Sequence, residues 1–242
     1  MHFGRSSAEA ERAKERALLA CLDAHAEDIE HLYLLGDVFD AYIEYRHLLP
    51  KGFARFQGLL ARWTDRGLPV TYLVGNHDPW HREYFAQELG VRVVPGALTT
   101  THHGLRLYLA HGDAAARDGL STRLRPWLRH PVPVWLYRSL LPADTGMRLA
   151  QWVNRRLGQH PPDPETATTL AAHARGLLRT TAATGVVMGH SHQPALHAWP
   201  EGLYLNTGCW HDERTLGRLD AQGLHLLRWN GTQTLSIEAR KP

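Results

Sequence analysis

The chain has 242 residues, of which 43% are hydrophobic and 21% are charged, and its formal net charge is +3. This composition is that of a globular protein and excludes a disordered one, and the length suits one domain with a sizeable core. The two cysteines, Cys21 and Cys209, have no paired spacing, which excludes a zinc ribbon and a disulfide framework and suits a reducing cytoplasm. No run of 18 apolar residues occurs and residues 1–16 are polar and charged, so we expect neither a membrane span nor a signal peptide.

The first part of the chain alternates helical and strand patterns. A capping box at residues 6–9 predicts a helix to about His25, and an amphipathic stretch predicts a second helix over Phe53–Arg66. Continuous apolar runs, typical of strands buried on both faces, lie at His31–Leu35, Pro69–Val74, Leu105–Ala110 and Gly185–Met188. This alternation predicts a layered α/β fold.

The pattern changes after residue 192. Short β-type runs separated by glycine turns lie at Leu203–Asn206, Leu224–Trp229 and Thr234–Ala239. They predict a second, largely antiparallel part. Both parts fit a single domain over residues 1–242, built as a two-sheet sandwich flanked by helices.

Residues 115–183 have a different character from the rest and are interpreted as a helical insertion or lid. The first part, residues 115–160, holds eight arginines against two acids, together with three tryptophans and four prolines. A further helix is predicted from Pro164-Glu165 to about Ala183, with proline at the first helical position. The arginine-rich part can serve the site or can be only a solvated helical cover.

Residues of the kind that bind metals follow several of the predicted strands. They are Asp37, Asn76, His111, His190 and His192. The exits of buried strands meet at one edge of an open α/β sheet, which is where such sheets bind ligands. A carboxylate can bridge two cations, and the amide and imidazoles complete a mixed nitrogen and oxygen site. Two metal ions held in this way promote phosphoryl transfer by neutralising charge and positioning the reacting atoms.

The segments GDVFD, GNHD, HGD and GHSH, in this order, resemble the motif set of the calcineurin-like metallophosphoesterases. The resemblance runs from residue 2 to about Trp210. It implies a four-layer αββα sandwich and a hydrolase with two divalent metal ions, which we expect to be Mn²⁺. It assigns Asp37 to both metals, His2 and His192 to the first, and Asn76, His111 and His190 to the second.

The same resemblance assigns His77 a catalytic role. This histidine would bind the phosphate or protonate the leaving oxygen, and Asp78 would hold its other ring nitrogen. Asp40 is interpreted as a helix cap.

The first family motif, D-x-H, is incomplete in this chain. His2-Phe3-Gly4 matches its end, but its aspartate and the strand that carries it would precede Met1. We expect the natural protein to continue upstream, since loss of a central strand would expose hydrogen-bonding groups of its neighbours. The alternative is a chain that lacks one ligand.

Within this family the chain is most similar to the UDP-2,3-diacylglucosamine hydrolases of lipid A biosynthesis. The similarity lies in HFG, in LGDVFDAYIEY, in Trp80 after GNHD and in the insertion after HGD. It implies hydrolysis of the pyrophosphate of a UDP-linked acylated sugar to UMP and 2,3-diacylglucosamine 1-phosphate. Arginines of the insertion suit a pyrophosphate, and its tryptophans and leucines suit acyl chains or an anionic membrane surface on the cytoplasmic face.

Two other functions are consistent with the sequence. His77 is the generic phosphoesterase residue, whereas the main branch of those hydrolases usually has arginine there, so another nucleotide or phosphate ester is an alternative substrate. A binding module that has lost its metal is a second alternative. We expect no nucleic-acid partner, because no stacking platform or recognition motif accompanies the arginines. No substrate-contact residue is identified.

Overall fold

The computed structural model describes residues 1–115, 127, 129–157 and 164–240. The chain divides into two compact units, each made of two segments. Unit 1 comprises residues 1–95 and 118–160, and unit 2 comprises residues 96–117 and 161–242.

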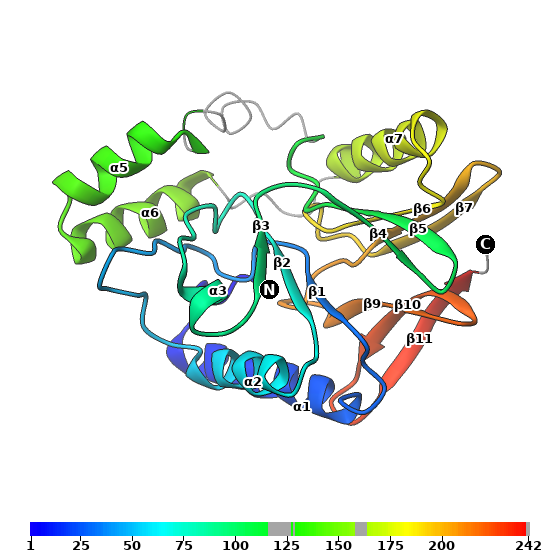
Figure 1. The fold of residues 1–242 in the computed structure, drawn as a ribbon, viewed down its shortest axis with the longest axis horizontal. Coiled ribbons are helices and arrows are strands. Elements are labelled where there is room, and N and C mark those ends of the chain that lie inside the picture. The colour runs from blue at the N-terminus through cyan, green and yellow to red at the C-terminus, as the bar shows by residue number, and fades with distance from the viewer. Residues whose placement is uncertain (116–126, 128, 158–163, 241–242) are drawn as a thin grey trace. The chain divides into compact units, whose positions relative to one another are not determined.

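Unit 1 is built on a parallel three-stranded sheet in the order β1-β2-β3. The strands are β1 (Leu32–Leu34), β2 (Val70–Leu73) and β3 (Arg92–Val94). The helices of its first segment are α1 (Ala8–Ala24), α2 (Ala54–Asp65) and the short α3 (Tyr84–Gln87) (Figure 1). All four residues of β2 are buried, as the continuous apolar run predicts for a central strand.

The two long helices begin and pack as their sequences dictate. Ser7 precedes α1, and its hydroxyl accepts the N–H of Ala10, which satisfies one of the free donors of the first turn. The buried side of α2 follows helical spacing and consists of Phe56, Leu59, Leu60 and Trp63. Arg66 and Gly67 then end the helix with N–H bonds to Trp63 and Thr64.

The second segment of unit 1 contains the helical hairpin α5 (Pro131–Leu140) and α6 (Ala143–Leu157). The His130 ring precedes α5 and accepts the N–H of Val132, and proline occupies the first helical position. Tyr137 donates its hydroxyl to the carbonyl of Gly146 at 2.7 Å, which joins the two helices. A ring contact of Tyr137 with Trp80, at 4.6 Å between centroids, packs the hairpin against the first segment of the unit.

Unit 2 contains a mixed five-stranded sheet in the order β4-β5-β6-β8-β7 and an antiparallel sheet in the order β11-β10-β9. The strands of the first sheet are β4 (Leu98–His102), β5 (Leu105–Leu109), β6 (Gly185–Met188), β7 (Ala195–Trp199) and β8 (Gly202–Asn206). Those of the second are β9 (Thr215–Asp220), β10 (Gly223–Trp229) and β11 (Thr234–Arg240). Helix α7 (Pro164–Thr180) packs Leu170, Ala174 and Leu178 onto Val186, Met188 and Tyr204.

The predicted α/β fold class is confirmed, and four strands and one short helix were missed. The missed elements are β3, β4, β7, β9 and α3. Strand β5 is not buried on both faces as predicted, because Arg106 in its middle is exposed. The cap assigned to Asp40 is wrong, since residues 41–53 contain no helix and the side chain is buried. Among the described helices, none is long and apolar enough to cross a bilayer.

Candidate functional site

Four of the six predicted metal ligands have a strained backbone. The φ angles of His2, Asp37, His190 and His192 are 53°, 49°, 64° and 59°, in the left-handed region. Only three other described residues without a glycine's freedom share this region, namely Phe53, His103 and Arg214. Such conformations cost energy and gather at functional sites, where the surrounding structure holds them in place. The clustering sets these four positions apart from most of the described chain.

In unit 1, the His2 ring lies between two carboxylates. Its Nε2 is 3.6 Å from Asp37 Oδ2 and its Nδ1 is 3.4 Å from Asp40 Oδ1. His2 and both carboxylates are buried. The ring therefore turns Nε2 toward Asp37 and Nδ1 toward Asp40. This arrangement suits His2 and Asp37 as partners in holding one cation, with Asp40 behind the ring.

Asp78 does not hold His77, and this expectation is wrong. The fully buried Asp78 carboxylate instead accepts the backbone N–H groups of Asp37, Val38, Phe39 and Gly75, at 2.7–3.3 Å, and the hydroxyl of Tyr72. A carboxylate that accepts several N–H groups fixes the loops that donate them. Asp78 therefore joins the loop after β1 to the loop after β2.

His77 is held by Asp40, which the sequence reasoning missed. Its Nδ1 lies 3.1 Å from the Asp40 carbonyl and 3.9 Å from Asp40 Oδ1, and its backbone N–H donates to Asp37 Oδ1 at 2.9 Å. Burial raises the pKa of Asp40 above its ordinary value, although nearby His77 and Arg5 oppose that shift. The signal available in the sequence was the second aspartate of GDVFD, three residues after Asp37.

Gly75 brings the two loops of unit 1 into close contact. A Cβ at this position would lie closer than 3.0 Å to the backbone nitrogen and the carboxylate of Asp37, a distance that real Cβ atoms essentially never show. Only glycine therefore allows the loop that carries Asn76 to approach the Asp37 side chain so closely.

Helix α1 holds the segment that carries His2. The Glu11 carboxylate accepts the N–H groups of Gly4 and Ser6, and Lys14 Nζ donates to the His2 carbonyl at 2.8 Å. Burial alone would raise the pKa of Glu11, but the N–H of Gly4, the Lys14 ammonium and the N–H of Ser6 together lower it. The buried ion pair of Glu11 and Lys14 thus fixes the backbone from His2 to Ser6.

In unit 2, the predicted ligands after β5 and β6 come together. His190 Nδ1 lies 3.2 Å from His111 Nε2, and the Gly189 N–H donates to the His111 carbonyl at 3.0 Å. The Asn206 side chain donates to the Gly189 carbonyl at 2.7 Å and so fixes the turn after β6. Two imidazole nitrogens at this separation form a pair that a divalent cation can share. His192, two residues further, belongs to the same turn.

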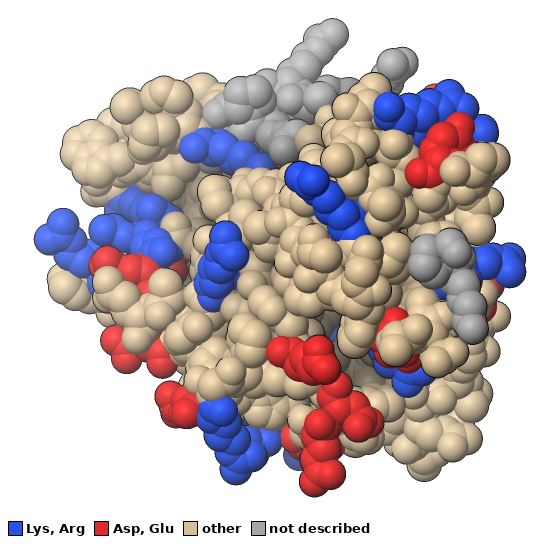
Figure 2. Space-filling view, turned by 45° about the vertical axis from the view of Figure 1, so that its right-hand side comes forward, with Lys and Arg blue, Asp and Glu red and all other residues tan. Residues whose placement is uncertain are grey.

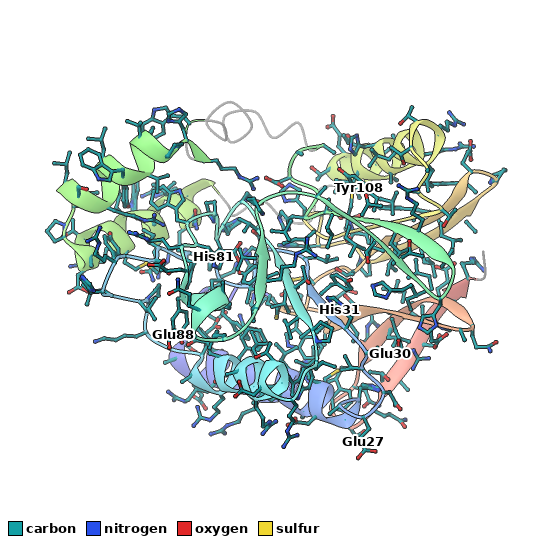
Figure 3. All side chains as sticks on the ribbon, viewed as in Figure 1. Glu27, Glu30, His31, His81, Glu88 and Tyr108 are labelled. Atoms are coloured by element: carbon teal, nitrogen blue, oxygen red, sulfur yellow. The ribbon has the colours of Figure 1, made fainter. Side chains whose placement is uncertain are left out.

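A buried histidine of unit 1, His81, is a core residue rather than a ligand. The His81 ring stacks on Tyr42 at 4.5 Å and makes edge contacts with Tyr72 and Phe85, beside helix α3 (Figure 3). Burial lowers the pKa of His81, against a raising effect of Asp78. Neither of its ring nitrogens has a hydrogen-bond partner within the described residues.

The hairpin α5–α6 exposes large apolar side chains. Trp135 and Leu140 are 64% and 73% exposed, and Val132, Leu136, Leu149 and Trp152 are also exposed. A second exposed pair, Leu48 and Leu49, lies in a basic loop between Arg46 and Lys51. The charged side chains on the face in Figure 2 form small groups of either sign among large uncharged areas.

Comparison with known proteins finds one family and several relatives that share one name. The family model described as calcineurin-like phosphoesterase matches residues 2–194. The UDP-2,3-diacylglucosamine hydrolase of Edwardsiella ictaluri is 30% identical over 90% of this chain and 86% of its own length. The enzyme of that name from Pseudomonas aeruginosa is 31% identical over 78% of this chain and 80% of its own.

A third relative matches over a shorter part of the chain, and a solved structure matches at lower sequence identity. The UDP-2,3-diacylglucosamine hydrolase of Porphyromonas gingivalis is 36% identical over 54% of this chain, and the match spans about half (51%) of that relative. The structure of Yfce, a phosphoesterase from E. coli, covers 93% of both chains at 18% identity, with a TM-score of 0.46 that is too low to support a statement about the site.

Proposed function

Because this chain belongs to the calcineurin-like phosphoesterase family, we propose that it hydrolyses the pyrophosphate of UDP-2,3-diacylglucosamine in lipid A biosynthesis. The products are UMP and 2,3-diacylglucosamine 1-phosphate. The observation that carries the proposal is the similarity to hydrolases of that name over nine-tenths of the chain, joined to a set of buried or half-buried ligand-type side chains in each unit. The protein is a hydrolase of phosphate or pyrophosphate bonds.

The donor groups suit divalent cations. We assign Asp37 to both ions, His2 and His192 to the first, and Asn76, His111 and His190 to the second. The Nε2 atom that His2 turns toward Asp37 and the facing nitrogens of His111 and His190 support this assignment. Two bound cations would neutralise the phosphoryl oxygens and lower the pKa of water. The mixed nitrogen and oxygen donors favour Mn²⁺.

His77 supplies the proton in this proposal. Because the Asp40 carbonyl accepts from Nδ1, the proton that His77 exchanges with substrate is the one on Nε2. The Asp40 carboxylate lies 3.9 Å from Nδ1 on the same side of the ring. His77 then donates to the leaving oxygen as the bond to phosphorus breaks.

The exposed apolar side chains of α5 and α6 suit a lipid-linked substrate. They offer a surface for the acyl chains and for the membrane in which such a substrate resides. The basic loop with Leu48 and Leu49 lies next to this hairpin, since Tyr45 meets Gly146 of α6. We assign the protein to the cytoplasmic face of the inner membrane, with this side of unit 1 on the anionic lipid.

One observation favours a second candidate, hydrolysis of another nucleotide or phosphate ester. His77 occupies a position where the main branch of lipid A hydrolases usually has arginine. The test is hydrolysis of UDP-2,3-diacylglucosamine with added Mn²⁺, followed by release of UMP, beside bis-p-nitrophenyl phosphate as a generic diester. Release of UMP that is lost in Asp37→Ala supports the proposal. Cleavage of the diester alone would replace it with the second candidate.

A further inference from the structure

Three side chains of the helical insertion donate to backbone carbonyls in the loops of the proposed site. Arg129 Nη2 donates to the carbonyl of Gly75 at 3.1 Å, and Arg138 Nη2 donates to that of Trp80 at 2.6 Å. The Asn154 amide donates to the carbonyl of Asp40. All of these residues belong to unit 1, and the three carbonyls lie in the loops that follow β1 and β2.

The contact of Arg129 acts on the peptide bond that precedes Asn76. The Gly75 N–H is fixed by Asp78 Oδ1 at 2.9 Å and its carbonyl by Arg129, so both ends of this residue are held by charged side chains. A second nitrogen of the guanidinium, Nη1, donates to the Pro95 carbonyl at 3.3 Å. The Arg129 guanidinium thus joins the loop after β2 to the end of β3. It also fixes the plane of the peptide bond between Gly75 and Asn76.

The contact of Asn154 acts on the group that orients His77. The Asp40 carbonyl accepts from His77 Nδ1 at 3.1 Å and also from the Asn154 amide. Two donors on one carbonyl hold it between them, so the position of the His77 ring depends on the position of helix α6. The half-buried Asn154 reaches this carbonyl from a helix whose neighbouring Arg155 and Arg156 are exposed.

We propose that Arg129 and Asn154 are positioning residues for hydrolysis, through which the insertion sets the geometry of Asn76 and His77. The inference rests on the proposed hydrolytic site, and it does not depend on the lipid-linked substrate. An insertion that only binds acyl chains would not need contacts to these carbonyls. Small displacements of groups in a site cost up to about 100-fold in rate.

The test compares Arg129→Ala and Asn154→Ala on the full chain with Mn²⁺, using bis-p-nitrophenyl phosphate, which has no acyl chain. We expect kcat for this diester to fall about 10- to 100-fold in both variants, with KM little changed. Bound Mn²⁺, measured by electron paramagnetic resonance at fixed total metal, should fall in Arg129→Ala and stay normal in Asn154→Ala. Arg129→Lys, which keeps a charged donor, should recover part of both losses.

The matched control is Arg148→Ala. Arg148 is exposed on α6 and makes no polar contact with any residue that the structure describes, so its diester turnover and Mn²⁺ binding should be normal. Normal diester kcat in Arg129→Ala and Asn154→Ala, with loss confined to UDP-2,3-diacylglucosamine, would overturn the proposal and leave the insertion a substrate-binding cover. A wild-type chain that cleaves the diester but not the lipid-linked substrate would instead reject the proposed substrate.

Discussion

The carboxylate of Asp78 accepts the backbone N–H of Val38 at 2.7 Å, across forty residues of sequence. This contact and its neighbours make Asp78 the junction between the loops that hold Asp37 and Asn76. Its position in the GNHD motif therefore reflects the assembly of the site rather than contact with His77.

Asp78→Asn should destabilise unit 1 strongly. The amide has only one oxygen to offer, so buried N–H groups lose their acceptor, at a cost of about 2–4 kcal/mol. Urea unfolding monitored by circular dichroism measures the change in free energy of unfolding. The control is Asp65→Asn, at an exposed position at the end of α2, which should change stability by less than about 0.5 kcal/mol. Equal stability of the two variants would contradict the role of Asp78.

His77→Ala should separate proton transfer from metal binding. We expect kcat to fall roughly 10²–10⁴-fold with bound Mn²⁺ retained, because the histidine donates a proton and is not assigned as a ligand. Asp37→Ala should instead abolish activity together with metal binding. His173→Ala, at an exposed site on α7, is the control and should have normal turnover. Normal turnover in His77→Ala would exclude it as the acid.

Gly75→Ala tests the close approach of the two loops. The added methyl group would overlap the Asp37 side chain and backbone, so the loops must move apart, and we expect loss of Mn²⁺ binding and of activity. Gly58→Ala is the matched control, because Gly58 lies inside α2 with no atom within 4 Å of the new Cβ. That change should raise stability by about 0.5–1 kcal/mol. Retained metal binding in Gly75→Ala would show that the contact is dispensable.

Glu11 predicts a pH-dependent contribution to stability. Its pKa is lowered in the folded protein from an ordinary value of 4.5, so its contribution is complete above that value and is lost as pH falls through the lowered pKa. Glu11→Gln should therefore lower Tm at pH 7 and have progressively less effect below pH 4.5. Glu9→Gln, at an exposed position of α1, serves as control. A Tm difference independent of pH would contradict the linkage.

The exposed Leu48-Leu49 pair and the basic residues beside it predict binding to anionic membranes. The chain should co-sediment with vesicles that contain phosphatidylglycerol and less with pure phosphatidylcholine, since Arg46 and Lys51 flank the Leu48-Leu49 pair. Leu48→Ser with Leu49→Ser should weaken binding at least about tenfold. Leu235→Ser is the control, because Leu235 is exposed to a similar degree on β11 of unit 2. Equal losses in both would reject a localised membrane contact.

The sequence predicted the buried strands better than the rest of the fold. Strand β2 (VTYL) is largely apolar and buried throughout, and Asn76 follows its exit. Strand β4 (LTTTH) is half exposed, and β9 (TLGRLD) contains glycine and charges, so neither carries a strong apolar pattern. Edge strands of this kind are specified by their partners and not by their own composition.

The contacts of Asp40 and Asp78 could not be read from the sequence for a different reason. Asp78 adjoins His77 along the chain, but its side chain points to the loop after β1. Asp40 is distant in sequence, yet it faces both His2 and His77. Side-chain contacts between loops depend on the conformation of those loops, which the types of the neighbouring residues do not determine.

The left-handed backbone at His2, Asp37, His190 and His192 lowers the stability of the fold at positions that the proposed metal site needs. Each such residue costs about 1–2 kcal/mol relative to a relaxed one, and glycine or asparagine would carry the same turn at lower cost. Substitutions that stabilise the fold would therefore replace these histidines first. A descendant of this chain released from selection for hydrolysis should become harder to unfold as it becomes inactive.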